Sequence, residues 1–273
     1  MEVGLVGQRG SERAETLTAT LRDRIRDRGA SVAVDPVTAD ALGIEGVDID
    51  RFDETDLVVS VGGDGTFLYA ARTAGATPML GVNLGEVGFL NAIPPSEAVE
   101  TVVDAVDALA ADRLAITELP RLRAACADAV LKPAINEILV QGPRRGAGAD
   151  ARLTVDVDGE RYASATADGV LVATPTGSTA YNLSEGGPIV APTTDALIVT
   201  PMCPRDGSRP LVVPDTATVD LRVEHAETGF VVADGRQHRT LSPPTTVAVS
   251  VTDEPLRIAG PGVEFYEALE KLA

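Results

Sequence analysis

Three glycines surround an acidic residue at positions 62–66, in the pentapeptide Gly-Gly-Asp-Gly-Thr. The pentapeptide follows an apolar run at 56–61 and precedes a segment with helical character, which predicts a strand-to-helix turn. Glycines let the backbone approach a ligand closely, and the first amides of a helix attract phosphate. A carboxylate among phosphates would repel them unless it binds metal or accepts a proton. Both roles belong to phosphoryl transfer, so Asp64 is the candidate catalytic residue.

The same turn also has a purely structural interpretation, in which Asp64 or Thr66 only caps the helix. A P-loop is excluded, because the GxxxxGK[ST] pattern is absent and neither Lys132 nor Lys271 follows a glycine-rich loop. The early segment GLVGQRG weakly resembles a dinucleotide-binding pattern, which a plain turn explains as well. The glycine-flanked aspartate remains the sharpest indication of catalysis.

Two further polar segments suit a nucleotide. Residues 168–190 begin at Asp168 and continue into a cluster of hydroxyl groups with paired glycines. Hydroxyls donate and accept hydrogen bonds, and a tyrosine ring can cover a planar group. Asn136 could bind an adenine edge and Glu137 two ribose hydroxyls, although this pair alone would more often be a surface turn. The hydroxyl cluster comprises Thr174, Thr176, Ser178, Thr179, Tyr181 and Ser184.

The chain of 273 residues has a formal net charge of −18, and such a surface repels nucleic acid and anionic membranes. Scarce lysine with abundant aspartate resembles proteins of extreme halophiles, which predicts best activity in molar KCl. The opening residues lack the features of a signal peptide, and no apolar stretch approaches the roughly 18 residues of a membrane span. We therefore expect a cytoplasmic protein without nucleic-acid or membrane partners. We expect no disulfide framework and no protein-held metal from Cys126, Cys203, His225 and His238.

Strand and helix signals alternate along the first third of the chain, which predicts a parallel sheet with helices on both faces. After about residue 114, short β-rich runs separated by Gly, Pro, Asp and Asn predict an antiparallel β domain. We expect an α/β domain at 1–112 and a β-rich domain at 113–259. A C-terminal helix at 260–273 is expected to pack back on the first domain.

These segments together resemble the NAD kinase family, in family order and over most of the chain. The pentapeptide GGDGT is shared with lipid kinases and, more loosely, with phosphofructokinases, whereas TPTGSTAY combined with INE is specific to NAD kinases. The matching segments are GGDGT at 62–66, GVNLGEVGFL at 81–90, INE at 135–137, the stretch 168–190, TPMCP at 200–204, RPLVVP at 209–214 and ADG at 233–235.

The resemblance implies the two-domain NAD kinase fold, with a Rossmann-like parallel sheet followed by a sandwich-like β domain. It implies phosphoryl transfer from ATP or polyphosphate to the 2′-hydroxyl of the adenosine ribose of NAD, with Asp64 as general base. Mg²⁺ or another divalent cation would enter on the donor nucleotide, and the protein would be a homo-oligomer, dimer or tetramer. The implied binding residues are Gly62, Gly63, Gly65, Thr66, Asn136, Glu137, Asp168, Ser178, Thr179, Ala180, Tyr181, Asn182, Leu183, Ser184, Cys203 and Arg236.

Two departures from the family pattern leave the choice between NAD and NADH open. Arg205 follows the CP dipeptide where the family often has histidine, and Arg236 follows the late DG where it often has glutamine. Arg144 and Arg145 either reach donor phosphates or belong to a surface loop. Two other functions are weighed: a related lipid or sugar-phosphate kinase, and a non-catalytic NAD sensor. The first lacks a role for TPTGSTAY, and the second would be expected to lose Asp64.

Overall fold

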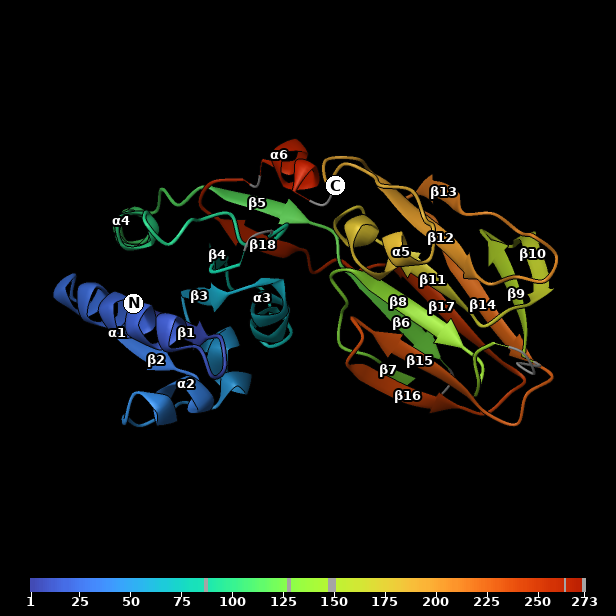
Figure 1. The fold of residues 1–273 in the computed structure, drawn as a ribbon, viewed down its shortest axis with the longest axis horizontal. Coiled ribbons are helices and arrows are strands. Elements are labelled where there is room, and N and C mark those ends of the chain that lie inside the picture. The colour runs from blue at the N-terminus through green and yellow to red at the C-terminus, as the bar shows by residue number, and fades with distance from the viewer. Residues whose placement is uncertain (86–87, 127–128, 147–150, 263, 272–273) are drawn as a thin grey trace. The chain divides into compact units, whose positions relative to one another are not determined.

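The structure is a computed structural model that describes residues 1–85, 88–126, 129–146, 151–262 and 264–271 (Figure 1). The chain forms two compact units. Unit 1 comprises Met1–Leu119 and Glu254–Ala273, and unit 2 comprises Pro120–Asp253. Within the described ranges, no helix is both long enough and apolar enough to cross a membrane.

Unit 1 is an α/β unit whose described strands form a six-stranded sheet in the order β2-β1-β3-β4-β18-β5. Neighbours from β2 through β18 pair in parallel, and β5 pairs with β18 antiparallel. The strands are β1 (Glu2–Gly7), β2 (Ser31–Val34), β3 (Leu57–Gly62), β4 (Met79–Asn83), β5 (Ile116–Leu119) and β18 (Leu256–Ala259). The helices are α1 (Glu12–Asp27), α2 (Pro36–Ala41), η1 (Ile49–Glu54), α3 (Asp64–Ala71), α4 (Ala98–Ala110) and α6 (Phe265–Glu270).

Helical periodicity explains how one face of this sheet is covered. Leu21 and Ile25 lie four residues apart on the buried side of α1, and the Ser11 side chain caps that helix by accepting from the amide of Ala14. Buried residues of α1 and α4 share one core cluster with alternate residues of β1, β3 and β4. On the opposite face, Gly4 leaves room for the ring of Phe52 in η1. The predicted layers around a parallel sheet are confirmed.

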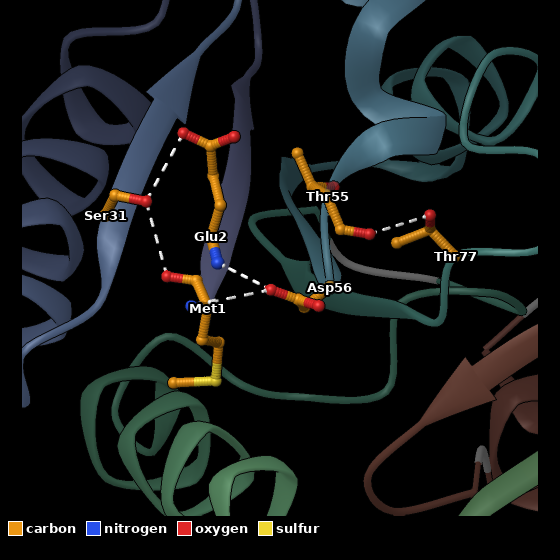
Figure 2. A network of polar contacts seen from close by, with 6 residues as sticks. All are labelled: Met1, Glu2, Ser31, Thr55, Asp56 and Thr77. Carbon is orange, nitrogen blue, oxygen red and sulfur yellow. Dashed lines mark hydrogen bonds and ion pairs between the residues drawn. The ribbon is translucent and has the colours of Figure 1, made fainter.

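A polar network ties together the amino ends of β1, β2 and β3 (Figure 2). The Asp56 carboxylate accepts a 2.7 Å hydrogen bond from the amide of Glu2 and lies 3.9 Å from the N-terminal ammonium group. The Ser31 hydroxyl donates to the carbonyl of Met1. These contacts lie at the amino ends of the strands. Because β1, β3 and β4 run parallel, their carboxyl ends meet at the opposite edge of the sheet. In open α/β sheets, that edge is where ligands bind.

Unit 2 is a β-sandwich, as predicted for the second part of the chain. Its described residues form two antiparallel sheets, in the orders β10-β9-β14-β17-β6-β7 and β13-β12-β11-β8-β15-β16. Inward residues of both sheets share one core cluster, for example Val249 of β17 and Val172 of β11. The strands of the first sheet are β6 (Leu122–Cys126), β7 (Ala129–Val130), β9 (Arg152–Val157), β10 (Glu160–Thr166), β14 (Val219–Glu224) and β17 (Thr245–Val251). Those of the second are β8 (Glu137–Gln141), β11 (Gly169–Ala173), β12 (Ala196–Met202), β13 (Leu211–Pro214), β15 (Gly229–Ala233) and β16 (Gln237–Leu241).

The unit boundaries fall at 119/120 and 253/254, whereas the sequence predicts 112/113 and 259/260. The difference comes from β5 and β18, two four-residue strands that pair with each other. β18 also pairs with β4, which places both strands in the sheet of unit 1. The C-terminal helix α6 belongs to unit 1 as well, where the rings of Phe265 and Phe89 meet edge to face at 6.0 Å.

Candidate functional site

The GGDGT segment forms the turn between β3 and α3 at the carboxyl edge of the sheet in unit 1. β3 ends at Gly62, Gly63 is the helix N-cap, and α3 begins at Asp64 with no side-chain cap. A Cβ atom at Gly62 would lie 2.5 Å from the Thr66 hydroxyl, so packing requires glycine there. At Gly63 and Gly65 a Cβ atom would meet nothing within 4 Å. These two glycines therefore leave the surface of the turn open to a ligand.

The Asp64 carboxylate does not cap its own helix. It accepts hydrogen bonds from the amides of Phe89 at 2.9 Å and Leu90 at 3.2 Å. The side-chain amide of Asn91 lies 3.5 Å from the same carboxylate and is itself held by the Ser60 hydroxyl at 3.0 Å. The aspartate is thus fixed by the segment that follows β4, which the sequence analysis singled out as GVNLGEVGFL.

Burial raises the pKa of Asp64 above its ordinary value of 3.8, because removing the carboxylate from water disfavours its charge. The amides of Phe89, Leu90 and Asn91 act in the opposite direction and only partly offset this effect. A carboxylate with a raised pKa is a stronger proton acceptor than an exposed one, and that property suits a general base.

In unit 2, the strand register brings three of the sequence motifs to one end of a sheet. Glu137 begins β8 and pairs with Ala173, the last residue of β11. The next residue of β8, Ile138, pairs with Ala233, the last residue of β15. Because both neighbours run antiparallel to β8, the INE, TPTGSTAY and ADG segments meet beside Glu137.

A cavity of about 510 Å³ lies against this sheet. Side chains alternate across a strand, so Glu137, Leu139 and Gln141 of β8 face it together. Its walls combine an apolar floor with a few polar and charged groups, the usual composition of a nucleotide-sized site. The lining residues are Glu137, Leu139, Gln141, Arg145, Tyr181, Phe230, Val232, Gly235, Arg236 and His238.

The turn that carries Asn136 and Glu137 is held by one carboxylate. Asp234 accepts hydrogen bonds from the amides of Ile135 at 2.9 Å, Asn136 at 2.8 Å and Glu137 at 3.3 Å. Burial, together with the nearby charge of Asp234, raises the pKa of Glu137 to about 8, and the amide of Tyr181 opposes the shift. One carboxyl oxygen of Glu137, Oε2, is buried and has no hydrogen-bond partner among the residues that the structure describes.

The hydroxyl-rich segment mostly folds its own loop. Thr174 donates to the carbonyl of Ile135 at 2.7 Å, and Ser178 donates to that of Val190 at 3.0 Å. Asn182 donates to two carbonyl groups and accepts at 2.7 Å from Thr200. In the described part of this segment, Tyr181 is the residue that lines the cavity. The other predicted binding residues of the segment are half-buried at Thr179 and Ala180 and exposed at Leu183 and Ser184.

Asp168 is not among the described residues that line the cavity, but it binds the loop that carries Arg145. Both of its carboxyl oxygens accept from the amide of Gly146 at 2.9 Å, next to Arg145. The Arg145 guanidinium donates to the hydroxyl of Tyr181 at 2.7 Å and to Gln141, and it lies over the Tyr181 ring. Arg145 therefore lines the cavity wall. Arg236 also lines the cavity, whereas Cys203 is exposed in a turn with φ of 47°.

The cavity floor and one wall are built from residues that no sequence motif indicates. Leu139, Phe230 and His238 line the cavity from three adjacent strands. Alternation along β8 was the available signal, because the residues at even spacing from Glu137 must share its face. The pairing of β8 with β15, which supplies Phe230, is not visible in a single sequence.

Metal ligands are not clustered in the described parts of the chain: no group of three or more His, Cys, Asp or Glu side chains could hold an ion there.

Comparison with known proteins assigns both units. Residues 3–108 match the ATP-NAD kinase N-terminal domain, and residues 132–260 match the ATP-NAD kinase C-terminal domain. The chain is 52% identical to an NAD kinase of Halorubrum lacusprofundi and 51% identical to one of Haloarcula marismortui, in each case over 100% of both chains. The chain belongs to the NAD kinase family. A Thiobacillus denitrificans member of the family is 34% identical over 98% of this chain and 95% of its own.

Two solved structures of NAD kinase family proteins confirm the predicted two-domain fold. Yeast NADH kinase complexed with NADH superposes with a TM-score of 0.87 at 23% identity, covering 100% of this chain and 87% of the other. An NAD kinase from Archaeoglobus fulgidus in complex with ATP gives a TM-score of 0.79 at 24% identity, covering 100% and 98%. At these identities the likeness concerns the fold.

Proposed function

We propose that this NAD kinase family member transfers the terminal phosphoryl group of ATP to the 2′-hydroxyl of the adenosine ribose of NAD, giving NADP. The observation that carries the proposal is the Asp64 carboxylate, which is immobilised by two backbone amides beside an open glycine turn. Full-length relatives at 52% and 51% identity that are named NAD kinases support the same reaction.

In the proposed reaction, the ribose 2′-oxygen forms a bond to the γ-phosphorus while the bond from that phosphorus to the β–γ bridging oxygen breaks. Asp64 accepts the hydroxyl proton as the attack proceeds, and ADP leaves with the bond electrons. Base catalysis of this kind contributes about 10²- to 10⁴-fold to the rate. The amides of the turn at Gly63 and Gly65 are proposed to contact phosphate oxygens, as the start of a helix favours anions.

The cavity of unit 2 is proposed to hold the dinucleotide. The carboxyl group of Glu137, which lines the cavity, would accept hydrogen bonds from ribose hydroxyls other than the reacting 2′-hydroxyl, and Asn136 would bind the adenine edge. The Tyr181 ring offers a face for a planar group. Arg145 and Arg236, both on the cavity wall, supply positive charge for the pyrophosphate.

A divalent cation is proposed to enter with the donor as its Mg²⁺ complex, because the protein offers no cage of its own among the described residues. Mg²⁺ keeps much of its water and commonly rides on nucleotide phosphates. We further propose a cytoplasmic, salt-adapted homo-oligomer. The formal charge of −18 supports the salt adaptation, since high ionic strength screens its self-repulsion.

The test is NADP formation from NAD, ATP and Mg²⁺ in molar KCl. Parallel reactions replace ATP with polyphosphate and NAD with NADH, which identifies the donor and the acceptor. NADP from the wild-type protein supports the proposal. A folded protein that binds NAD and forms no phosphorylated product with either donor would instead be a sensor.

A further inference from the structure

Asp234 lies beside the cavity that we propose for the dinucleotide. Its carboxylate holds the backbone of the neighbouring turn, and together with burial its charge also raises the pKa of Glu137. Its carboxylate accepts from three consecutive amides, those of Ile135, Asn136 and Glu137. These bonds fix the backbone of the turn from which both adenosine-binding side chains project. The turn follows from the register, because β15 ends at Ala233 beside the start of β8 and so delivers residue 234 to that point.

The same carboxylate is a like charge close to Glu137, and both side chains are buried. Two neighbouring carboxylates in a site of low polarity disfavour each other's ionisation. The three amides favour the charged form of Asp234, whereas Oε2 of Glu137 has no partner among the described residues. Of the two carboxyl groups, Glu137 is therefore the one whose pKa is raised and that holds a proton more readily before a ligand supplies donors.

We propose that Asp234 is a positioning residue of the NAD site, which holds the Asn136–Glu137 turn in its binding geometry and makes NAD binding coupled to release of a proton from Glu137. The inference rests on the proposed function, because it takes two ribose hydroxyls of NAD, other than the 2′-hydroxyl that reacts at Asp64, as the arriving donors. Two hydroxyl donors favour the ionised form of Glu137 over its protonated form, because the proton of the carboxylic acid would occupy one of the oxygen positions that accept a hydrogen bond.

The other ionisable groups around Glu137 do not reproduce this arrangement. Tyr181 contributes its backbone amide to the Glu137 carboxyl group, and Arg145 is engaged with Tyr181 and Gln141. Arg236 and His238 line the same cavity. The imidazole of His238 is therefore tested by a variant of its own.

The experiment measures NAD affinity by calorimetry from pH 6 to 9 in molar KCl, without donor, in buffers of different ionisation enthalpy. With a pKa of Glu137 of about 8, affinity in the wild type should rise about tenfold between pH 7 and 9, and binding at pH 7 should release close to one proton. Asp234→Asn removes the neighbouring charge, so the midpoint should fall and the rise between pH 7 and 9 should shrink below tenfold, while burial of Glu137 still holds its pKa above the ordinary value. Asp195→Asn, an exposed residue away from the cavity lining, is the charge-matched control and should keep the wild-type profile.

A purely structural role of Asp234 would weaken binding equally at every pH and leave the midpoint in place, which overturns the coupling. Glu137→Gln should abolish the proton release, and His238→Gln should leave the midpoint unchanged; loss of the midpoint in His238→Gln would assign the titration to the histidine. A carbon-13 titration of the Glu137 carboxyl group in the ligand-free protein supplies a readout independent of NAD. If that titration behaves as expected while NAD fails to bind at any pH, the proposed function is refuted rather than the interaction of the two carboxylates.

Discussion

Replacing Asp64 with asparagine isolates the proton-accepting role of its carboxylate. The side chain keeps its shape, but the new amide nitrogen cannot accept from a backbone amide, so the bond from Phe89 or that from Leu90 is lost. The loss of a base is expected to lower kcat by about 10²- to 10⁴-fold, or ~2.7–5.5 kcal/mol of barrier. The dissociation constant for NAD is measured beside the rate, so that a loss of binding is separated from the loss of the base.

The assay is single-turnover NADP formation, measured from pH 4 to 8 beside equilibrium NAD binding. In the wild type, the rate should fall as the pH drops through the raised pKa of Asp64, because only the carboxylate can accept a proton. This acid limb should be absent from Asp64→Asn. Asp40→Asn makes the same change of charge at an exposed residue of the same unit, and it should keep both the wild-type rate and the fall of that rate at low pH. A rate within threefold of wild type in Asp64→Asn, in a protein with normal thermal stability, would refute the assignment of the base.

Three other substitutions and a solvent test follow from the same structure. Gly177→Ala would place a Cβ atom 2.0 Å from the carbonyl oxygen of Asn136, and it should destabilise the fold by at least ~1–3 kcal/mol in thermal melts. Gly63→Ala meets nothing within 4 Å, so it should melt like the wild type while the rate falls; an unchanged rate would exclude close phosphate approach there. The pKa of Glu137 is about 8 in the folded protein and 4.5 in the unfolded chain, so the wild type loses a few kcal/mol of stability as the pH rises from 4.5 to 8. Glu137→Gln removes this loss, and it should therefore be more stable than the wild type above pH 8 but not below pH 4.5. Activity should be highest in molar KCl, and a maximum in dilute buffer would contradict the salt adaptation inferred from the charge of −18.

The strongly patterned elements could be predicted from the sequence, because their signals are local. The helical spacing of Leu21 and Ile25, and the unbroken apolar run of β3 before Gly62, each specify an element without knowledge of the rest of the chain. The glycine turn and its aspartate were found for the same reason. What Asp64 contacts was not predictable, since the amides of Phe89 and Leu90 reach it through tertiary structure.

The sequence does not reveal where a short strand such as β18 pairs, or which residues from different strands line the cavity together. β18, of four residues, joins two strands that are far away in sequence, and its place is decided by pairing rather than by composition. Hydroxyl groups of the TPTGSTAY segment suggested ligand contacts, but Thr174 and Ser178 bond to nearby backbone. A polar residue type does not reveal whether its partner is a ligand or the chain itself. The role of Asp234 likewise depends on the meeting of β15 with β8.

The place of β18 has a consequence for biosynthesis. This strand lies between β4 and β5 in the sheet of unit 1, yet it leaves the ribosome only after the whole of unit 2 (Figure 1). Until then, β4 exposes an unpaired edge that could pair with another nascent chain. Unit 2 is continuous in sequence and can fold while the sheet beside Asp64 is still incomplete. The sheet that carries Asp64 is thus completed only after unit 2 has been synthesised, when β18 takes its place between β4 and β5.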